Sequence, residues 1–273
     1  MKPDPDSKNA PSTSVAASEW AGYYEARGEE VDFSQLDLGD FRNLHHRVII
    51  DKIREYFTGG SLLEIGAGDS DRLIDVCKRL TPERSVGLDF IQGGCDRLKA
   101  KADKAGANVE VVCADMFSPP EAMRGQFDFV MSFGVVEHFH DLPGVLRAIG
   151  SFAKPGGIVF TLIPNNKNTI YGRLMYRWNR QVYDAHVLYD ADEVEKAHRD
   201  AGMTVLWNGH LVSSSFGMLS WCFKDREPDF TYWIYKQLTR VSKVFWFIES
   251  KFGLFRPTRY FAPYIVCVSR AGR

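Results

Sequence analysis

Residues 61–71 read SLLEIGAGDSD, in which a short apolar run is followed by an acid, two glycines one residue apart and a group of small polar residues. A strand that ends in glycine and turns into a helix presents bare backbone N–H groups to a ligand. Glu64, two residues before Gly66, is placed to meet a cationic amino group. Asp89 ends the next apolar run. Its distance along the sequence from Gly66 is about that at which an acid after the second strand reaches ribose hydroxyls. A glycine turn also has a purely structural reading, but the two acids favour a binding site.

The apolar pattern around this motif predicts strands that alternate with helices. Strands are expected at 62–65, 85–89, 109–113, 127–132 and 157–163, and helices at about 71–80, 92–105 and 142–153. Short buried strands separated by amphipathic helices are typical of βαβ units, which build a parallel sheet covered on both faces. A helix near 190–201 and strands near 203–208 and 262–269 complete the pattern.

Three segments lie outside this alternation. Residues 1–18 are rich in Pro, Ser, Ala and charge, and we expect a disordered tail there. Residues 19–58 are predicted to form a helical cover, because apolar side chains recur at helical spacing over 42–57. His45 and His46 of that helix are expected to be polar surface residues. Residues 212–260 form an insertion before the last strand.

Composition limits the kind of protein and its partners. The chain has 273 residues, and its 34 basic side chains nearly balance 35 acidic ones, which gives no support for a nucleic-acid partner. Five cysteines are dispersed without metal-ligand spacing, which favours reduced thiols and a cytoplasmic location. We expect neither a signal peptide nor a membrane-spanning helix, since the sequence has no basic and apolar leader and no run of about 18 uncharged apolar residues.

Five segments in this order, LLEIGAGDS, VGLDF, CADMF, FDFVMSFGVVEHF and FAKPGG, resemble the motif series of small-molecule class I S-adenosylmethionine-dependent methyltransferases. The resemblance implies an α/β fold with a Rossmann-like, seven-stranded, mostly parallel sheet, an antiparallel last strand and a helical insertion before it. The methyltransferase core would comprise 59–211 and 261–273. A nicotinamide oxidoreductase is the nearest competitor, but its third glycine is replaced here by Asp71.

The resemblance implies S-adenosylmethionine as cofactor and a role for each matching residue. Glu64 and the backbone of Gly66, Ala67 and Gly68 would hold the methionine end. Asp89 would accept hydrogen bonds from both ribose hydroxyls. The loop has no lysine clamp, which agrees with a cofactor that carries no phosphate.

Further residues would surround the adenine and the sulfonium. Phe90 would pack on the adenine face, Asp115 would receive the adenine amino group, and the Met116 backbone would meet a ring nitrogen. Phe133 and Gly134 would lie beside the cofactor after the fourth strand.

The N-terminal aromatic residues and Ser70 complete the expected cofactor site. Tyr24, with Trp20 and Tyr23, could close over the cofactor, because aromatic faces favour cations; a cover for an exposed core edge is the alternative. Ser70 stands where many family members have a third glycine, and it can cap the following helix instead.

Two histidines are candidates for catalysis. His186 follows the fifth strand, on the side where ligands bind in such sheets, and histidine suits a general base by its pKa. The alternative is that His186 packs without a role in catalysis. His138, in GVVEHF, would lie next to the cofactor, and its alternative role is to orient the loop. Related ubiquinone-pathway enzymes use an upstream carboxylate near this Glu-His pair to hold a metal. Gly134 occupies that position here, and we predict no metal.

The expected reaction is transfer of a methyl group to a small-molecule acceptor, in a saccharide or secondary-metabolite biosynthesis pathway. A hydroxyl acceptor is favoured. The alternatives are N-methylation of a small amine, and an inactive cofactor-binding scaffold protein.

The insertion contains a helical stripe with aromatic and basic neighbours. The stripe comprises Ile234, Leu238, Val241, Phe245, Ile248 and Phe252. Three readings stay open at this point. The stripe could pack on the core as a substrate cover, form a homodimer seam, or dock through 230–256 on a membrane or a lipid-linked acceptor.

Overall fold

Seven strands form a single sheet in the computed structural model of the chain, which describes residues 36–223 and 227–272. The strand order is β3-β2-β1-β4-β5-β7-β6. The strands are β1 Ser61–Ile65, β2 Arg84–Asp89, β3 Glu110–Cys113, β4 Phe127–Phe133, β5 Ala153–Pro164, β6 Thr204–Leu211 and β7 Tyr264–Arg270. Neighbouring strands from β3 to β5 pair in parallel, whereas β7 runs antiparallel to both β5 and β6. The predicted fold class is confirmed.

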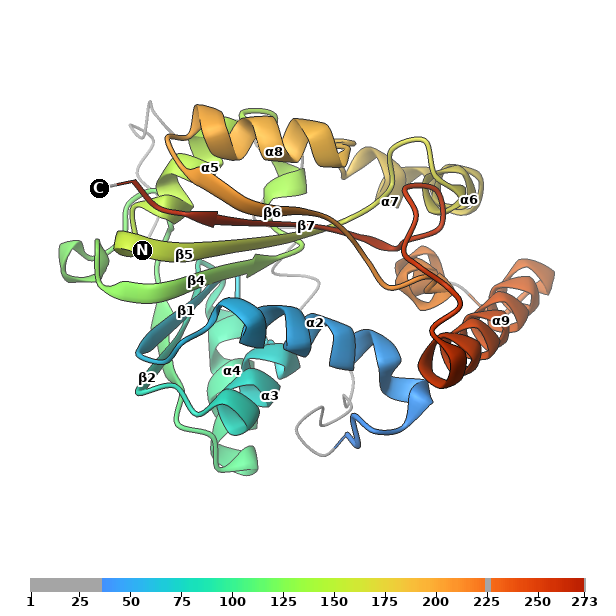
Figure 1. The fold of residues 1–273 in the computed structure, drawn as a ribbon, viewed down its shortest axis with the longest axis horizontal. Helices are drawn as coiled ribbons and strands as arrows, with labels where there is room; N and C mark the ends of the chain where they lie inside the picture. The colour runs from blue at the N-terminus through green and yellow to red at the C-terminus, as the bar shows by residue number, and fades with distance from the viewer. Residues whose placement is uncertain (1–35, 224–226, 273) are drawn as a thin grey trace.

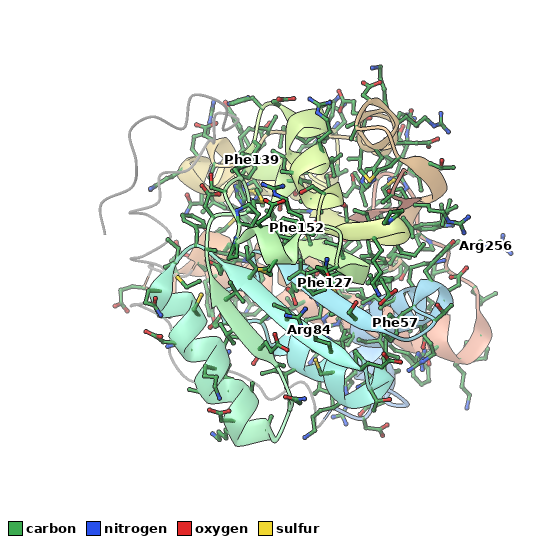
Figure 2. All side chains as sticks on the ribbon, turned by 90° about the vertical axis from the view of Figure 1, so that its left-hand side faces the viewer. Phe57, Arg84, Phe127, Phe139, Phe152 and Arg256 are labelled. Carbon is green, nitrogen blue, oxygen red and sulfur yellow. The ribbon has the colours of Figure 1, made fainter. Side chains whose placement is uncertain are left out.

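Helices cover both faces of this sheet (Figure 1). On one face lie α2 Leu44–Tyr56, α3 Asp71–Leu80 and α4 Gln92–Ala105, and on the other lie α5 Leu142–Gly150 and α8 Ala191–Asp200. Successive side chains of β1 point to opposite faces of the sheet. Leu62 therefore packs against the helices α2, α3 and α4, and Leu63 packs against α5 and α8. Phe127 and Phe152 lie inside the second layer (Figure 2). Every residue of β1 is buried, as expected for a parallel strand covered on both faces.

Local sequence signals explain the ends of the helices near the site. Ser70 caps α3, since its hydroxyl accepts a hydrogen bond from the Leu73 N–H at 3.0 Å. Asp190 and Glu193 form a reciprocal capping box at the start of α8. The predicted ranges of α3 and α4 agree with the structure residue for residue.

The structure adds elements that the sequence pattern did not predict. The polar segment after β5 folds into two short helices, α6 Ile170–Trp178 and α7 Arg180–Asp184. The remaining elements are single 3₁₀ turns, η2 Phe41–Asn43, η3 Glu121–Met123, η4 Val136–His138 and the longer η5 Phe216–Phe223. β5 begins at Ala153, earlier than the predicted 157, and its pairing with β4 is irregular between Phe127 and Phe129.

The insertion between β6 and β7 contains η5 and a long helix, α9 Phe230–Phe252, at one end of the molecule (Figure 1). Only part of the predicted stripe belongs to the packed face of α9: Leu238 packs on a cluster that includes Phe216 and Leu219. Val241 and Phe252 are exposed, whereas the buried positions are Ser242 and Trp246. Helical spacing located the helix, but its packed face also depends on backbone groups of Ser214 and of Phe216, the first residue of η5, which bond Trp246 and Ser242.

His45 and His46 are also placed differently from the prediction. His46 is buried, and the His45 ring stacks on Trp246 with the centroids 5.2 Å apart. Burial lowers the pKa of His45 to about 3 and that of His46 to about 2, so both are neutral near pH 7. His45 packs against Trp246 of α9, and neither histidine is a polar surface residue. Among the described residues, no helix is long and apolar enough to span a membrane.

Candidate active site

The strand order predicts a ligand-binding crevice at the carboxyl ends of β1 and β4. After β1 the chain builds β2 and β3 on one side, then crosses to β4 on the other. In open α/β sheets, ligands bind at such a switch in strand order. The loops that begin at Gly66 and Gly134 leave the sheet there, and Asp89 ends the neighbouring strand β2.

The turn after β1 requires glycine. Gly66 has φ +68° and Gly68 has φ +47°, both in the left-handed region that disfavours side chains. A Cβ added to Gly66 would lie 2.5 Å from the Val135 Cγ2 atom, so the loop after β4 closes directly on this turn. The Ala67 N–H donates to the Leu88 carbonyl at 3.0 Å, which holds the turn to the end of β2.

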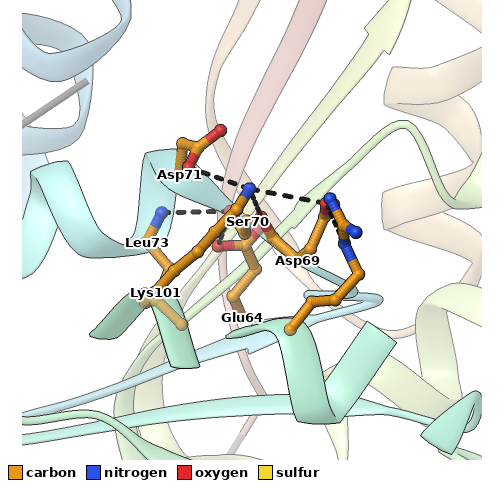
Figure 3. Close-up of polar contacts among 7 residues, drawn as sticks. Glu64, Asp69, Ser70, Asp71, Leu73 and Lys101 are labelled. Atoms are coloured by element: carbon orange, nitrogen blue, oxygen red, sulfur yellow. Dashed lines mark hydrogen bonds and ion pairs between the residues drawn. The ribbon is translucent and has the colours of Figure 1, made fainter. Parts of the chain in front are cut away.

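Glu64 lies beneath this turn with its side chain almost fully buried, at 2% exposure. The Ser70 hydroxyl donates to its Oε2 at 3.0 Å (Figure 3). Burial raises the pKa of the Glu64 carboxyl to about 8, although the Arg72 charge and the Ser70 hydrogen bond partly oppose that rise. Within residues 36–223 and 227–272, the Ser70 hydroxyl is the one hydrogen-bond partner of this buried carboxylate, which suits a cationic ligand such as an ammonium group.

Two acids of the turn are braced by helix α4, which the sequence analysis did not foresee. The Lys101 ammonium reaches Asp69 Oδ2 at 3.4 Å and Asp71 Oδ1 at 3.0 Å, and it donates to the Asp69 carbonyl at 2.9 Å (Figure 3). Arg97, one helical turn earlier, pairs with Asp69 at 3.3 Å. In the sequence, the i, i+4 spacing of Arg97 and Lys101 could have indicated that both lie on one face of a helix and can reach the same acid.

Asp89 fixes the other side of the turn. Its Oδ2 accepts from the Gly68 N–H and its Oδ1 from the Ile91 N–H, each at 2.8 Å. Burial raises the pKa of Asp89, and these backbone hydrogen bonds offset part of the rise. A carboxylate has about four lone-pair sites, so both oxygens can still accept bonds from a diol.

The residues expected around adenine form a more open surface. Phe90 is 50% exposed although its neighbour Asp89 is buried. The Ala114 N–H donates to the Asp89 carbonyl at 2.9 Å, which brings the end of β3 beside the end of β2. Asp115 is exposed, with Oδ1 accepting from the Phe117 N–H at 2.9 Å, and Met116 is buried in the core. An exposed aromatic face next to a carboxylate suits a planar, hydrogen-bonding base.

Phe133 and Gly134 border the same crevice from β4. The Arg72 guanidinium lies over the Phe133 ring, 4.6 Å from its centroid. Gly134 has φ +68°, and its N–H donates to the Leu162 carbonyl at 3.0 Å. Tyr24, Trp20 and Tyr23, the expected lid, fall outside the described residues.

The two candidate histidines lie side by side, because the segment after α7 is bonded to the loop after β4. The Val187 N–H donates to the Glu137 carbonyl at 2.7 Å. His138 Nδ1 lies 2.8 Å from the Ala185 carbonyl, and the rings of His138 and His186 are 5.0 Å apart. These contacts join residues nearly fifty positions apart, which sequence spacing could not predict.

Both histidines have the same tautomer. His186 Nδ1 lies 2.7 Å from the Val182 carbonyl, and a carbonyl oxygen can only accept, so Nδ1 carries the proton in each ring. Nε2 then has the lone pair. Burial lowers the pKa of His138 to about 4 and also lowers the pKa of His186. Each neutral ring can therefore accept a proton or coordinate a cation.

Glu137 joins these histidines in a cluster with the spacing of a metal site. One ligand atom from each of Glu137, His138 and His186 lies within 4.8 Å of the other two. Glu137 is buried, which raises its pKa to about 8, and its Oε2 has no hydrogen-bond partner among the residues that the structure describes. The sequence predicted no metal, on the ground that Gly134 lacks a carboxylate. That prediction did not foresee His186 as a third ligand, and it stays untested.

Comparison with known sequences places the chain in a family. Residues 41–207 match the family model described as a methyltransferase domain, and the chain belongs to that family. A ubiquinone biosynthesis O-methyltransferase of Ruegeria pomeroyi is 28% identical over 183 residues, which cover 64% of this chain and 72% of the relative. The ubiquinone biosynthesis O-methyltransferase of Dinoroseobacter shibae is 27% identical over 221 residues, which cover 71% of this chain and 86% of the relative.

Solved structures show the same fold at low sequence identity. A methyltransferase from the Haloferax volcanii complex with the Trm112 activator aligns with a TM-score of 0.60 at 15% identity, covering 93% of this chain and 97% of that chain. The geranyl diphosphate C-methyltransferase of Streptomyces coelicolor aligns with a TM-score of 0.55 at 11% identity, covering 82% and 77%. Together with the family match, they show a class I methyltransferase that uses S-adenosylmethionine.

Proposed function

We propose that this methyltransferase transfers the methyl group to a hydroxyl of a small-molecule acceptor. The observation that carries the proposal is the histidine pair, which is held by main-chain hydrogen bonds beside the loop that closes on Gly66. A neutral imidazole at this position can remove the proton that a hydroxyl acceptor loses. The names of the related ubiquinone biosynthesis O-methyltransferases support the same chemistry.

In this proposal the cofactor is held by the residues that surround the crevice. Glu64 and the turn of Gly66, Ala67 and Gly68 bind the methionine end, and Asp89 binds the ribose. The adenine and sulfonium contacts come from Phe90, Asp115, Met116, Phe133, Gly134 and Tyr24. When bound, S-adenosylmethionine supplies an activated methyl group. The buried Glu64 carboxyl and the turn that admits no Cβ at Gly66 fit such a cofactor.

His186 is the proposed general base, because it is less buried than His138. Its Nε2 accepts the acceptor's proton while its Nδ1–H stays bonded to the Val182 carbonyl, which fixes the ring. His138 positions the loop and the neighbouring ring. The low pKa of both rings keeps them unprotonated at neutral pH, which a base requires.

For the acceptor we propose a saccharide or a secondary metabolite. N-methylation of a small amine is the competing assignment, and it differs in its need for a base. An amine can lose its proton to solvent before it reacts, whereas a hydroxyl benefits from a base in the site.

Turnover assays with radiolabelled cofactor and matched hydroxyl and amine acceptors test this proposal. His186→Gln should lower kcat for a hydroxyl acceptor about a hundredfold or more and remove the acidic limb of its pH profile. His210→Gln is the matched control, because His210 lies near the end of β6 and is half-buried like His186. Methylation of amines alone, or unchanged kcat in His186→Gln, would refute the O-methyl assignment.

A further inference from the structure

Most exposed large hydrophobic side chains of the described chain gather on α9 and the segment that follows it. We call residues 230–261 the α9 surface. Its exposed apolar side chains are Phe230, Trp233, Val241, Val244, Phe247, Phe252, Leu254, Phe255, Tyr260 and Phe261. Single exposed apolar residues are ordinary, but a contiguous group marks an interaction site.

The inner side of α9 is already used. Ser242 accepts from the Phe216 N–H at 2.9 Å, and the Trp246 indole donates to the Ser214 carbonyl, so this side packs on η5. Phe230, Trp233 and Val244 follow one another at helical spacing on the opposite side, with Phe230 74% and Trp233 57% exposed. The outward face of α9 therefore carries apolar side chains that the fold does not bury, alternating along the helix with the exposed basic residues Arg240 and Lys251.

Cations flank this outward apolar face. The α9 surface carries six exposed basic residues, Lys236, Arg240, Lys243, Lys251, Arg256 and Arg259. Arg256 extends away from the body of the molecule (Figure 2). The single acid of the segment, Glu249, is half-buried, and burial raises its pKa. The segment has six basic residues and one acid, whereas the rest of the chain has 28 basic and 34 acidic residues, so its net charge is opposite in sign to that of the rest.

We propose that the α9 surface binds the anionic surface of a lipid bilayer. Aromatic side chains that insert at the headgroup boundary, with lysine and arginine beside them, are the composition of an interfacial helix. A symmetric dimer through this face would bring the cations of two copies together, which disfavours it. Nucleic acid would match the cations but would leave the aliphatic residues Val241 and Val244 uncovered.

The location of the α9 surface relates membrane binding to the crevice. The carboxyl ends of β4 and β5 point toward the end of the molecule where α9 lies (Figure 1). Asn165, just after β5, donates to the carbonyls of Arg259 and Ala262, each at 2.9 Å. A bilayer on this surface would thus lie on the acceptor side of the sheet. If the proposed function holds, an acceptor presented from the membrane, such as a lipid-linked saccharide, is expected.

Vesicle flotation tests the membrane site. The full chain should float with vesicles of phosphatidylcholine and phosphatidylglycerol, bind phosphatidylcholine alone weakly, and detach as NaCl is raised. Lys236→Gln/Arg240→Gln/Lys243→Gln should lower partitioning about a hundredfold, at roughly fivefold per charge. Trp233→Ser should also weaken it. Matched controls are Lys196→Gln on α8 and Leu206→Ser on β6, both exposed positions elsewhere.

The outcomes separate the alternatives. Loss of binding in the α9 variants, with cofactor affinity and Tm unchanged, supports the site whether or not any acceptor is methylated. Equal binding of all variants would overturn it, as would the absence of binding to anionic vesicles. A concentration-dependent dimer in light scattering that Trp233→Ser dissolves would assign the surface to a second copy instead.

Discussion

Cofactor affinity should depend on the ionisation of Glu64. Its carboxyl is buried and accepts a hydrogen bond from the Ser70 hydroxyl, and its pKa is raised to about 8. A cationic amino group binds the ionised form, so binding must release a proton whenever Glu64 starts out neutral. The affinity of the protein for the cofactor should therefore fall as the pH decreases below the raised pKa of Glu64.

The expected magnitude is large enough to measure. With a pKa of about 8, the ionised fraction of Glu64 rises about 75-fold between pH 5.5 and 7.5, and the association constant should rise with it. At pH 7 about 0.9 proton should be released per cofactor bound. The cofactor's own amino group stays mostly protonated in this window, since α-amino pKa values lie near 7.7–8.0.

Isothermal titration in buffers of different ionisation enthalpy measures both quantities. Glu64→Gln, the isosteric control, should bind more weakly at pH 7.5 by about tenfold or more and lose the pH slope and the proton release. A flat affinity between pH 5.5 and 7.5, with no proton released by the wild type, would refute the placement of the amino group at Glu64.

Further perturbations test the turn and the histidine cluster. Gly66→Ala should abolish detectable cofactor binding, because the added Cβ would lie 2.5 Å from Val135 Cγ2, and Val135→Ala in the same chain should partly restore it in the same titration. Unimpaired binding by Gly66→Ala alone would contradict the close contact. Treatment with EDTA should leave turnover unchanged if the prediction of no metal holds. Activity that EDTA removes and one divalent ion restores would assign Glu137, His138 and His186 as ligands instead.

The sequence predicted the core of the fold because its signals are local. Short apolar strands, the glycine turn and the Ser70 cap each act within a few residues, and the ranges 71–80 and 92–105 were predicted without error. The approach of Glu64 and Asp89 to the glycine turn follows from the strand order of such sheets.

Long-range packing set the features that the sequence did not predict. The exposed face of α9 depends on the backbone groups of Ser214 and Phe216, and the burial of His45 depends on Trp246. The pairing of His138 with His186 depends on main-chain hydrogen bonds between distant loops. None of these contacts leaves a periodic signal in the chain.

Titration of the wild type and of Asp89→Asn with S-adenosylmethionine and its demethylated product tests the central assignment most directly. Asp89 bonds both the Gly68 and Ile91 N–H groups, and an amide can accept with one oxygen only, so the variant loses part of the turn as well as a ribose acceptor. The wild type should bind both nucleosides at a single site, and Asp89→Asn should bind at least tenfold more weakly with its fold retained by circular dichroism. A wild type that binds neither nucleoside, or a variant that binds as well as the wild type, would contradict the account.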